Sequence, residues 1–394
     1  MTKVLIVNNN LQLGGVQKSL VNLLNELVEN DSLDISLLLF STEGPLIKRV
    51  PKSVGIITPS LLFRCCGCVR GDQSPLPYKI LRSVCVALTR MIGRTRTLRL
   101  FYPFQKKLDG YDVAVSFLHS GSQRVFYGGC NEFVLNCVDA KKKITFLHCD
   151  YESIDANSEE NTKLYSAFDQ IAACSEGARE AFLRVLPEFF DKTVVVPNCY
   201  DYDHLFDVKR TKRNNKNDYL SLITVARFGK EKGILRAIRA VASLGDKASM
   251  IRYSIIGSGK EYRTAEQLLC ALNLNDIVTL YGEEEDPYSQ MNDADVLIIP
   301  SVSEAAPLVV GEAAALGVPI LTTQTSSAGE LVEKTGFGWV CENTETGLQQ
   351  SIKWLLENPS IIQERRAHLE TLSFDNSYAV EMFMKLLSDS RDQF

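Results

Sequence analysis

Two glutamates eight positions apart, Glu304 and Glu312, have the residue type and spacing to bind one polar ligand. The apolar run before them, residues 295–300, predicts a buried strand that ends just before Glu304. Pro307 then opens a helix predicted over 308–316, in which Glu312 lies about a turn and a half from the start. Ligands bind beyond the carboxyl ends of parallel strands, and a helix start attracts anions, so the pair predicts a ligand with a phosphate and several hydroxyls. By themselves, the two glutamates fit a solvated surface equally well.

Two cations, Arg227 and Lys232, occupy a second loop of the same kind. This loop joins a strand predicted over 220–226 to a helix predicted over 233–244. A fixed positive pair can hold a diphosphate and stabilise the charge that grows on a departing phosphate. A lone arginine or lysine is by default surface charge, and the place at a strand end is what favours the functional interpretation.

Two candidate positions belong to the amino-terminal half of the chain. Gly14 and Gly15 lie between the first predicted strand and the first predicted helix, where glycine lets the backbone approach a ligand and the helix start favours negative charge. His148 ends a strand predicted over 144–147. Most lone histidines are structural, but at this edge the side chain is a candidate hydrogen-bond donor or general base.

Three motif-like segments have simpler explanations. The Gly-Ser-Gly of residues 257–259 follows a strand but lacks the third glycine of a dinucleotide fingerprint, and a tight turn explains it. The Asp-Ala-Asp of residues 293–295 has the spacing of a metal-binding D-x-D motif, yet it lies at a helix-to-strand junction and is interpreted as a turn. The C-x-x-C of residues 65–68 has no second pair at zinc-finger distance. We therefore predict no metal site.

The elements that position these residues alternate strand with helix, which is typical of parallel sheets covered by helices on both faces. Predicted strands cover residues 3–8, 34–40, 112–117, 144–147, 170–174 and 193–196, and then 220–226, 253–256, 277–281, 296–299 and 318–322. A charged stretch at 209–218 is a candidate linker or surface loop. The predicted fold class is α/β, with two doubly wound Rossmann-like domains, and 394 residues fit two domains of about 200 each.

Composition is that of a soluble globular protein, with 45% apolar and 23% charged residues. No stretch approaches the ~20 apolar residues that cross a bilayer, and the first strand is too short for a signal-peptide core, so we expect a cytoplasmic protein. Most of the 11 cysteines lie in apolar runs, where cysteine behaves as a small hydrophobic residue, and we expect them to be reduced.

Charge is concentrated in one segment, residues 64–107. This segment has ten basic residues and one acid, Asp72, although the whole chain has a net charge of −5. Apolar residues recur there at helical spacing, so the segment predicts one or two basic amphipathic helices. Such helices bind anionic lipid or pack on a core with a solvated basic face, and the sequence leaves both possibilities open. Nucleic acid is not expected, because the chain is acidic overall and has no nucleic-acid motif.

In its order of motifs the chain resembles the retaining glycosyltransferases of family 4, which have the GT-B fold. The resemblance extends over nearly the whole chain. It rests on Gly14-Gly15, His148 with Asp150-Tyr151, Phe168-Asp169, Cys174-Ser175-Glu176, Val196-Pro197-Asn198, Arg227 with Lys232-Gly233, Gly257-Ser258-Gly259, and Glu304 with Glu312.

The resemblance implies a role for each matching residue. Arg227 and Lys232 match the pair that neutralises the donor diphosphate. Glu304 matches the first glutamate of the family's E-x7-E motif, near the donor sugar, and Glu312 matches the second, which binds the ribose hydroxyls. His148 matches the histidine at the reacting centre.

Further donor-binding positions follow from the same resemblance. Gly14 and Gly15 match the glycine loop near the diphosphate and the acceptor. Tyr281 and Gly282 fall where the family holds the nucleotide base.

One departure from the family concerns the segment between the two glutamates. The chain has Ala305-Ala306-Pro307 where many members have glycine and phenylalanine, and proline offers no N–H to a ligand. The amides of Leu308 and Val309 remain available to the donor. This variation, with the H-x-D-Y form at His148, is similar to members that make capsule or exopolysaccharide.

The resemblance implies an N-terminal acceptor-side domain of residues 1–198 plus 375–394, with a C-terminal helix crossing back, and a nucleotide-sugar domain of residues 199–374. It also implies a sugar transferred with retention, in the cleft between the domains, from a UDP- or GDP-sugar to a hydroxyl of a glycan or lipid-linked acceptor. The donor is a co-substrate and no cofactor or metal is expected.

Two other functions stay open from the sequence. One is a nucleotide-sugar-binding protein with a GT-B fold and no turnover, although all four of Arg227, Lys232, Glu304 and Glu312 are present. The other is a dinucleotide-dependent oxidoreductase, for which the glycine fingerprint is missing. If the basic segment 64–107 binds lipid, it would hold the enzyme at the inner face of the membrane.

Overall fold

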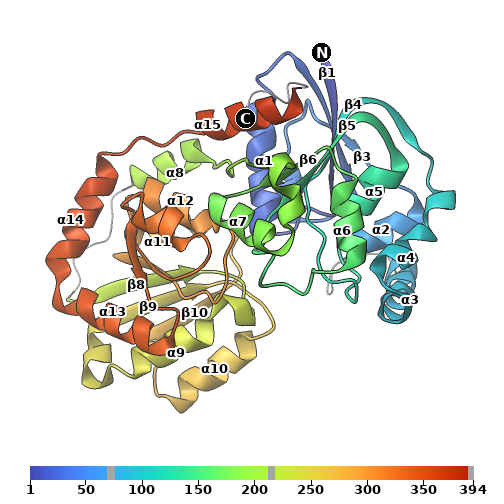
Figure 1. Ribbon diagram of the computed structural model, residues 1–394. Helices are drawn as coiled ribbons and strands as arrows, with labels where there is room; N and C mark the ends of the chain where they lie inside the picture. The colour runs from blue at the N-terminus through green and yellow to red at the C-terminus, as the bar shows by residue number, and fades with distance from the viewer. Residues whose placement is uncertain (69–75, 212–217, 389–394) are drawn as a thin grey trace. The chain divides into compact units, whose positions relative to one another are not determined.

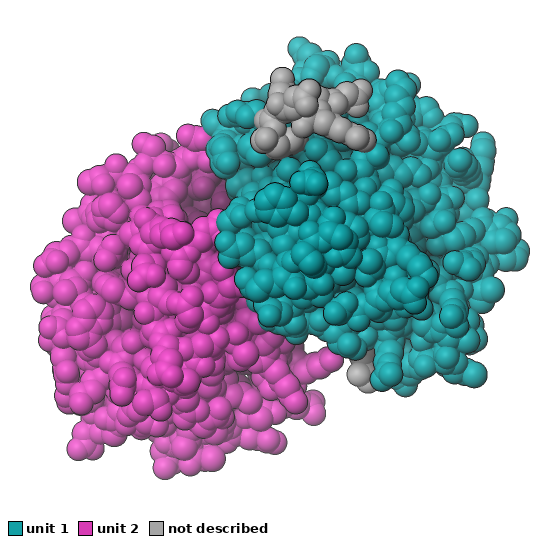
Figure 2. All heavy atoms as spheres, viewed as in Figure 1, with its two compact units in different colours: residues 1–199, 376–394 teal, residues 200–375 magenta. Residues whose placement is uncertain are grey.

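The computed structural model describes residues 1–68, 76–211 and 218–388. The chain divides into two compact units, residues 1–199 with 376–394 (unit 1) and residues 200–375 (unit 2). Figure 2 colours unit 1 teal and unit 2 magenta. The predicted domain boundaries lie one residue away from these positions. Most of the charged stretch at 209–218, predicted as a linker, lies outside the described residues.

Unit 1 is built on a seven-stranded parallel sheet in the order β3-β2-β1-β4-β5-β6-β7. Its strands are β1 (Thr2–Asn8), β2 (Leu33–Leu39), β3 (Gly55–Ile57), β4 (Leu108–Ser116), β5 (Val138–Leu147), β6 (Gln170–Ala173) and β7 (Thr193–Val195). Its helices are α1 (Gly15–Leu27), α2 (Leu61–Gly67), α3 (Leu76–Ile92), α4 (Arg94–Arg99), α5 (Cys130–Cys137), α6 (Glu159–Ser166), α7 (Glu176–Val185) and α15 (Ser377–Leu387).

Alternate residues of β1 face two different cores of unit 1. Val4 and Ile6 belong to a core that α1 and α15 cover, whereas Leu5 and Val7 belong to a core under α2 and α5. A strand covered on both faces must be apolar at every position, which explains the continuous apolar run of β1. The two-sided cover and parallel pairing confirm the doubly wound prediction for this unit (Figure 1).

Unit 2 has a six-stranded parallel sheet in the order β10-β9-β8-β11-β12-β13. Its strands are β8 (Leu220–Val225), β9 (Ile251–Ile256), β10 (Val278–Gly282), β11 (Val296–Ile299), β12 (Ile320–Thr323) and β13 (Gly338–Cys341). Its helices are α8 (Tyr202–Lys209), α9 (Ile234–Ala242), α10 (Tyr262–Ala271), α11 (Tyr288–Asp293), α12 (Leu308–Ala315), α13 (Glu345–Glu357) and α14 (Pro359–Glu370). Here too, Val296 and Ile298 face one core and Leu297 and Ile299 the other.

The last helix of the chain, α15, belongs to unit 1 although all of unit 2 precedes it. Phe383 and Leu386 are fully buried in the core that α1 also covers. Asn376 donates a hydrogen bond through Nδ2 to Glu26 Oε1 of α1, at 2.7 Å. Figure 1 shows α15 in red beside α1 in blue. The chain therefore passes from unit 1 to unit 2 and returns.

The predicted strands all form, and two short edge strands, β3 and β13, were not predicted. Among the described residues, no helix is long and apolar enough to cross a membrane. The cysteines of the C-x-x-C segment, Cys65 and Cys68, are buried in the core beside α2 as free thiols. Their burial agrees with a packing role.

Candidate active site

Each sheet reverses its winding direction once, and several of the candidate residues lie at these two points. In unit 2 the chain builds β8, β9 and β10 in one direction and then β11, β12 and β13 in the other, so β8 and β11 are neighbours. In unit 1 the corresponding neighbours are β1 and β4. A crevice opens beyond the carboxyl ends of strands at such a point, and ligands of open α/β sheets bind there.

The cation Lys232 and the carboxylate Glu304 are joined in unit 2. Lys232 follows β8, Glu304 follows β11, and their Nζ and Oε1 atoms are 2.6 Å apart. Ser301 Oγ donates a second hydrogen bond to Glu304 Oε1, at 2.6 Å. The Glu304 side chain is 9% exposed and that of Lys232 is 24% exposed. The pair therefore lies largely out of water, where its attraction is screened less than at the surface.

The loop that carries Lys232 is held against the end of β11 by a close backbone approach. Gly233 has φ 65°, and a Cβ at this position would lie 1.9 Å from the carbonyl oxygen of Pro300. Only glycine meets both requirements. Val302 N also donates to Glu231 O at 2.7 Å. These contacts fix the distance between the two loops, and so the position of Lys232 relative to Glu304.

The second cation, Arg227, pairs with a carboxylate from its own loop. One of its guanidinium nitrogens lies 2.6 Å from Glu231 Oε1, and the arginine side chain is 73% exposed. Desolvation raises the pKa of Glu231, but Arg227 and backbone hydrogen bonds outweigh it, so this pKa is lowered overall. Glu231 is thus a carboxylate beside both cations.

The glycine turn at 257–259 packs against the loop that carries Arg227 and forms backbone hydrogen bonds with it. Phe228 N donates to Ser258 O at 2.8 Å, and Glu261 N donates to Phe228 O at 3.0 Å. A Cβ on Gly257 would lie 2.0 Å from the carbonyl oxygen of Ala226. The interpretation of this segment as a turn therefore fits its place in the structure.

Glu312 is buried in α12 and accepts a hydrogen bond from a tyrosine. Tyr288 of α11 donates through its hydroxyl to Glu312 Oε1 at 2.8 Å. Burial raises the pKa of Tyr288 far above its usual value, with Glu312 acting in the same direction, so the tyrosine remains a proton donor. Glu312 is 3% exposed and is oriented by this bond. The predicted ribose-binding carboxylate is therefore an ordered acceptor.

The remaining predicted donor-binding residues of unit 2 lie at the same edge of the sheet. Leu308 and Val309 form the first turn of α12, whose amides have no acceptor inside the helix. Tyr281 and Gly282 end β10, and Gly257 N donates to Gly282 O at 2.6 Å. Tyr281 is 49% exposed, which leaves its ring accessible to a ligand.

The predicted D-x-D segment lies at the opposite end of the sheet. Asp295 precedes β11, and its Oδ2 accepts a hydrogen bond from Ser221 N near the start of β8, at 2.9 Å. Both positions are at the amino ends of their strands. The segment therefore forms a turn on the edge away from Lys232 and Glu304, as the sequence interpretation has it.

In unit 1, His148 follows β5 and packs against two aromatic rings. Its ring centroid is 5.6 Å from that of Phe146 and 4.7 Å from that of Phe117. Burial lowers the pKa of His148 to about 3, and His119 adds to this shift. Nε2 is buried and, among the described residues, has no hydrogen-bond partner. A neutral imidazole with such a pKa is a weak base, so it is suited to hydrogen bonding rather than to proton abstraction.

A second histidine, His119, repeats this arrangement at the neighbouring strand. It follows β4, which lies between β1 and β5 in the sheet. Burial lowers the pKa of His119 to about 4, and its Nδ1 is another buried atom without a partner in the described part of the chain. Gly14 and Gly15 begin α1 after β1. Three loops at one edge of the sheet thus contribute candidate residues.

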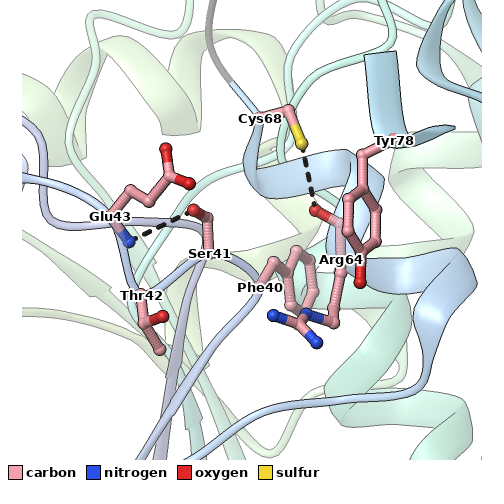
Figure 3. Close-up of a pocket in the computed structure, with 7 residues that line it drawn as sticks. All are labelled: Phe40, Ser41, Thr42, Glu43, Arg64, Cys68 and Tyr78. Carbon is pink, nitrogen blue, oxygen red and sulfur yellow. Dashed lines mark hydrogen bonds between the residues drawn. The ribbon is translucent and has the colours of Figure 1, made fainter. Parts of the chain in front are cut away.

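Unit 1 also has a small pocket beyond the carboxyl end of β2. Its lining residues are Phe40, Ser41, Thr42, Glu43, Arg64, Cys68 and Tyr78. Figure 3 shows the pocket, with hydrogen bonds from Glu43 N to Ser41 Oγ and from Cys68 Sγ to the Arg64 carbonyl. The guanidinium carbon of Arg64 lies 5.3 Å from the centre of the Tyr78 ring. Hydroxyl, carboxylate and guanidinium groups on an aromatic support are suited to binding hydroxyl groups.

Sequence reasoning missed several residues that orient the site. Glu231 could have been found, because it lies four positions after Arg227 and beside Lys232. His119 had a weaker signal, a polar residue after an apolar run. Ser301 and Tyr288 had none, since their roles depend on pairings between segments that are far apart in the sequence.

Comparison with known families identifies part of this chain. Residues 206–371, nearly all of unit 2, match the family model described as glycosyl transferases group 1. The putative colanic acid biosynthesis glycosyltransferase WcaL of Escherichia coli strain K12 is 34% identical over 142 residues, which are 34% of this chain and 35% of that protein. The amylovoran biosynthesis glycosyltransferase AmsK of Erwinia amylovora is 26% identical over 181 residues, 43% of this chain and 44% of that protein.

These sequence matches span less than half the length of either relative, whereas structural similarity extends over the whole chain. The crystal structure of Anabaena Alr3699/HepE in complex with UDP-glucose covers 99% of this chain and 100% of its own, with a TM-score of 0.66 and 16% identity. At that identity the likeness establishes the fold. The chain thus has the GT-B fold, and within it residues 206–371 match the glycosyl transferases group 1.

Proposed function

We propose that this protein is a retaining glycosyltransferase of polysaccharide biosynthesis. It would transfer a sugar from a nucleoside diphosphate sugar, with UDP or GDP as the nucleotide, to a hydroxyl of a glycan or lipid-linked acceptor. The observation that carries the proposal is the Lys232–Glu304 pair at the point where the sheet of unit 2 reverses direction, with the buried Glu312 eight residues further on. Relatives named for colanic acid and amylovoran biosynthesis, and a similar fold solved with UDP-glucose, support it.

The donor would bind along the carboxyl edge of the sheet in unit 2. Arg227 and Lys232 would bind the diphosphate, and the free amides of Leu308 and Val309 would add the positive potential of a helix start. Glu312, oriented by Tyr288, would accept hydrogen bonds from the ribose hydroxyls. These groups provide the charge stabilisation that other enzymes obtain from a divalent cation, so we expect turnover to be the same in EDTA.

The reaction would break the bond between the sugar's anomeric carbon and the diphosphate oxygen and form a bond from the same carbon to the acceptor oxygen. The acceptor's proton would pass to the departing diphosphate, whose new negative charge Arg227 and Lys232 stabilise. Attack from the face that the diphosphate leaves retains the anomeric configuration. His148 would hold a sugar hydroxyl through its unpaired ring nitrogen, since its lowered pKa makes it a poor base.

Arg227 and Lys232, the proposed diphosphate clamp, are tested by removing one cation at a time. Lys232→Ala and Arg227→Ala should each lower turnover by an order of magnitude or more, because one charge-stabilising donor is often worth about a hundredfold. Turnover is measured as release of the nucleoside diphosphate. Lys230→Ala is the matched control, since Lys230 is exposed on the same loop. Rates within twofold of wild type for both clamp variants would rule out the clamp.

The donor is found first by a thermal-shift screen of UDP- and GDP-sugars. A ligand at about 100 times its dissociation constant adds about 2.7 kcal/mol of stability. A sugar nucleotide that stabilises the protein but is never turned over, with any acceptor, would favour the second candidate function, a nucleotide-sugar-binding protein. A change in NADH fluorescence on mixing would instead favour the oxidoreductase.

A further inference from the structure

The outward face of α3 is apolar. Leu76 is 69% exposed, Ile80 57%, Val84 52% and Met91 80%. At 3.6 residues per turn, these four positions fall within a sector of about 80° around the helix. Single exposed apolar residues are ordinary, but a contiguous stripe on a soluble protein marks an interaction surface.

Core packing accounts for the other face of the helix. Cys85 and Thr89 are buried, and Leu81 packs against the core under α2 and α5. These positions lie roughly opposite the exposed stripe on a helical wheel. The sequence left open whether the apolar residues of this segment bind lipid or pack on a core. In the structure some of them face the core and others face outward. Leu81 packs inward, whereas Ile80, Val84 and Met91 have no core to cover.

Basic residues border the apolar stripe. Lys79 and Arg90 are exposed on α3, on one side of the stripe, and Arg96 and Arg99 are exposed on the neighbouring α4. The segment 64–107 has ten basic residues against one acid. An apolar centre with a basic border fits the surface of a bilayer that contains anionic lipid. A nucleic acid would satisfy the charges but would leave the stripe exposed to water.

We propose that α3 is a membrane-docking helix that lies in the surface of a bilayer rich in anionic lipid. Leu76, Ile80, Val84 and Met91 enter the boundary between headgroups and acyl chains. Lys79 and Arg90 bind the anionic headgroups, and their long side chains can reach the interface from the side of the helix. The protein is thereby held on the membrane without spanning it.

Docking on this face has a consequence for the acceptor, which rests on the proposed function. Tyr78, on the inward side of α3, lines the pocket at the end of β2 (Figure 3). A helix with its side chains is about 10–12 Å across, so the pocket would lie about one helix diameter from the headgroups. A sugar attached to a lipid in that bilayer could reach this position, so docking favours a lipid-linked acceptor.

The full chain is tested by co-sedimentation with vesicles of phosphatidylcholine alone and of phosphatidylcholine with 30% phosphatidylglycerol by mole. Wild type should bind the anionic vesicles and lose this binding as salt rises. Ile80→Asp with Met91→Asp should lower binding by at least tenfold. Lys79→Glu with Arg90→Glu should do the same, because each basic residue near the surface is worth about fivefold in partitioning.

Matched controls separate the surface from general effects of charge. Met250→Asp places an acid on an exposed methionine of unit 2 and should leave binding unchanged. Arg263→Glu with Lys353→Glu changes the net charge as much as the basic α3 variant does, at exposed positions of α10 and α13. All substituted residues are exposed, so circular dichroism and the melting temperature should match those of wild type. Stabilisation by the donor nucleotide sugar should also be unchanged, which keeps this test separate from that of the proposed function.

Three outcomes would overturn the proposal. One is vesicle binding that survives both α3 double substitutions. Another is equal binding to vesicles without phosphatidylglycerol. The third is a wild-type dimer in light scattering that Ile80→Asp with Met91→Asp converts to monomer, because the apolar stripe would then cover a second copy of the chain.

Discussion

At the scale of single residues, the candidate site is a set of charges that already have partners. Lys232 is paired with Glu304, and Arg227 with Glu231. Each cation is thereby held in place before a ligand arrives. Under the proposed function, the diphosphate of the donor would compete with these two carboxylates for the cations. Glu231→Gln keeps the shape of the side chain that contacts Arg227 but removes its charge. We expect this substitution to weaken the attraction that holds Arg227.

Two half-buried histidines of unit 1, His119 and His148, predict how stability depends on pH. The pKa values of His119 and His148 are lowered to about 4 and about 3, whereas an unfolded histidine titrates near 6.5. Between these values the unfolded chain binds protons that the folded chain does not, so stability falls as pH drops below about 6.5. Above that pH both forms are neutral and the contribution is constant.

Urea unfolding followed by circular dichroism between pH 4.5 and 7 measures this dependence. His119→Gln should flatten the acid slope by up to about 1.4 kcal/mol per pH unit, the value for one proton. His368→Gln, at an exposed position of α14, is the matched substitution. A slope that is the same in wild type and in His119→Gln would contradict the lowered pKa.

At the scale of elements, one glycine connects the loops that carry the cation and the carboxylate. Gly233→Ala would put a methyl group 1.9 Å from the Pro300 oxygen, at a φ of 65° that disfavours any side chain. The strain of left-handed backbone alone is about 1–2 kcal/mol. The clash adds to it and must displace Lys232, so both stability and turnover should fall.

Gly245→Ala is the control that has the backbone strain without the clash. Gly245 has φ 61°, almost the same conformation, but a Cβ there would meet no atom within 4 Å. Thermal unfolding and nucleoside diphosphate release are measured for both variants. Equal effects of the two substitutions would mean that the contact with Pro300 does not position Lys232.

The elements also show what could be predicted from the sequence. Strands buried on both faces, such as β1 and β11, are continuous apolar runs and were found within one or two residues. β5 was predicted from Ile144, but it begins at Val138, because Lys141 and its polar neighbours hide the first part of the strand. In α3, periodicity located the helix but could not say which of its two apolar sides meets the core.

For single residues too, position could be predicted but contacts could not. Lys232 and Glu304 could be located because they follow recognisable strands, and Glu312 because it lies in a recognisable helix. Their bonds could not be predicted. The Lys232–Glu304 pair joins residues 72 positions apart, and the tyrosine that orients Glu312 comes from a different helix. Local sequence gives positions along an edge, whereas the pairing depends on the order of strands in the sheet.

At the scale of the whole molecule, the chain consists of two units, and the unfolding of each can be followed separately. Both tryptophans, Trp339 and Trp354, lie in unit 2, with ring centroids 5.8 Å apart. Their fluorescence therefore reports on unit 2, while circular dichroism reports on both units. Stability measurements can thus assign an effect to one unit.

Phe383→Ala should destabilise unit 1 by about 3–5 kcal/mol, because a fully buried aromatic side chain leaves a cavity in the core under α1 and α15. Circular dichroism should show an earlier transition on urea unfolding, and the tryptophan signal should keep the wild-type midpoint. Tyr378→Ala, at a 61% exposed position of the same helix, should change neither. A tryptophan midpoint that moves with the dichroism would show that the two units unfold together.

The return of α15 to unit 1 also sets an order of events during synthesis. Residues 1–199 leave the ribosome first, but the helix that closes one face of their core follows only after residues 200–375. At 5–20 residues per second, that interval is roughly 9–35 s. Unit 2 is continuous in the chain and can fold while the core that α1 and α15 share still lacks α15 and its Phe383. The nascent chain would therefore depend on a chaperone most during translation of its second half.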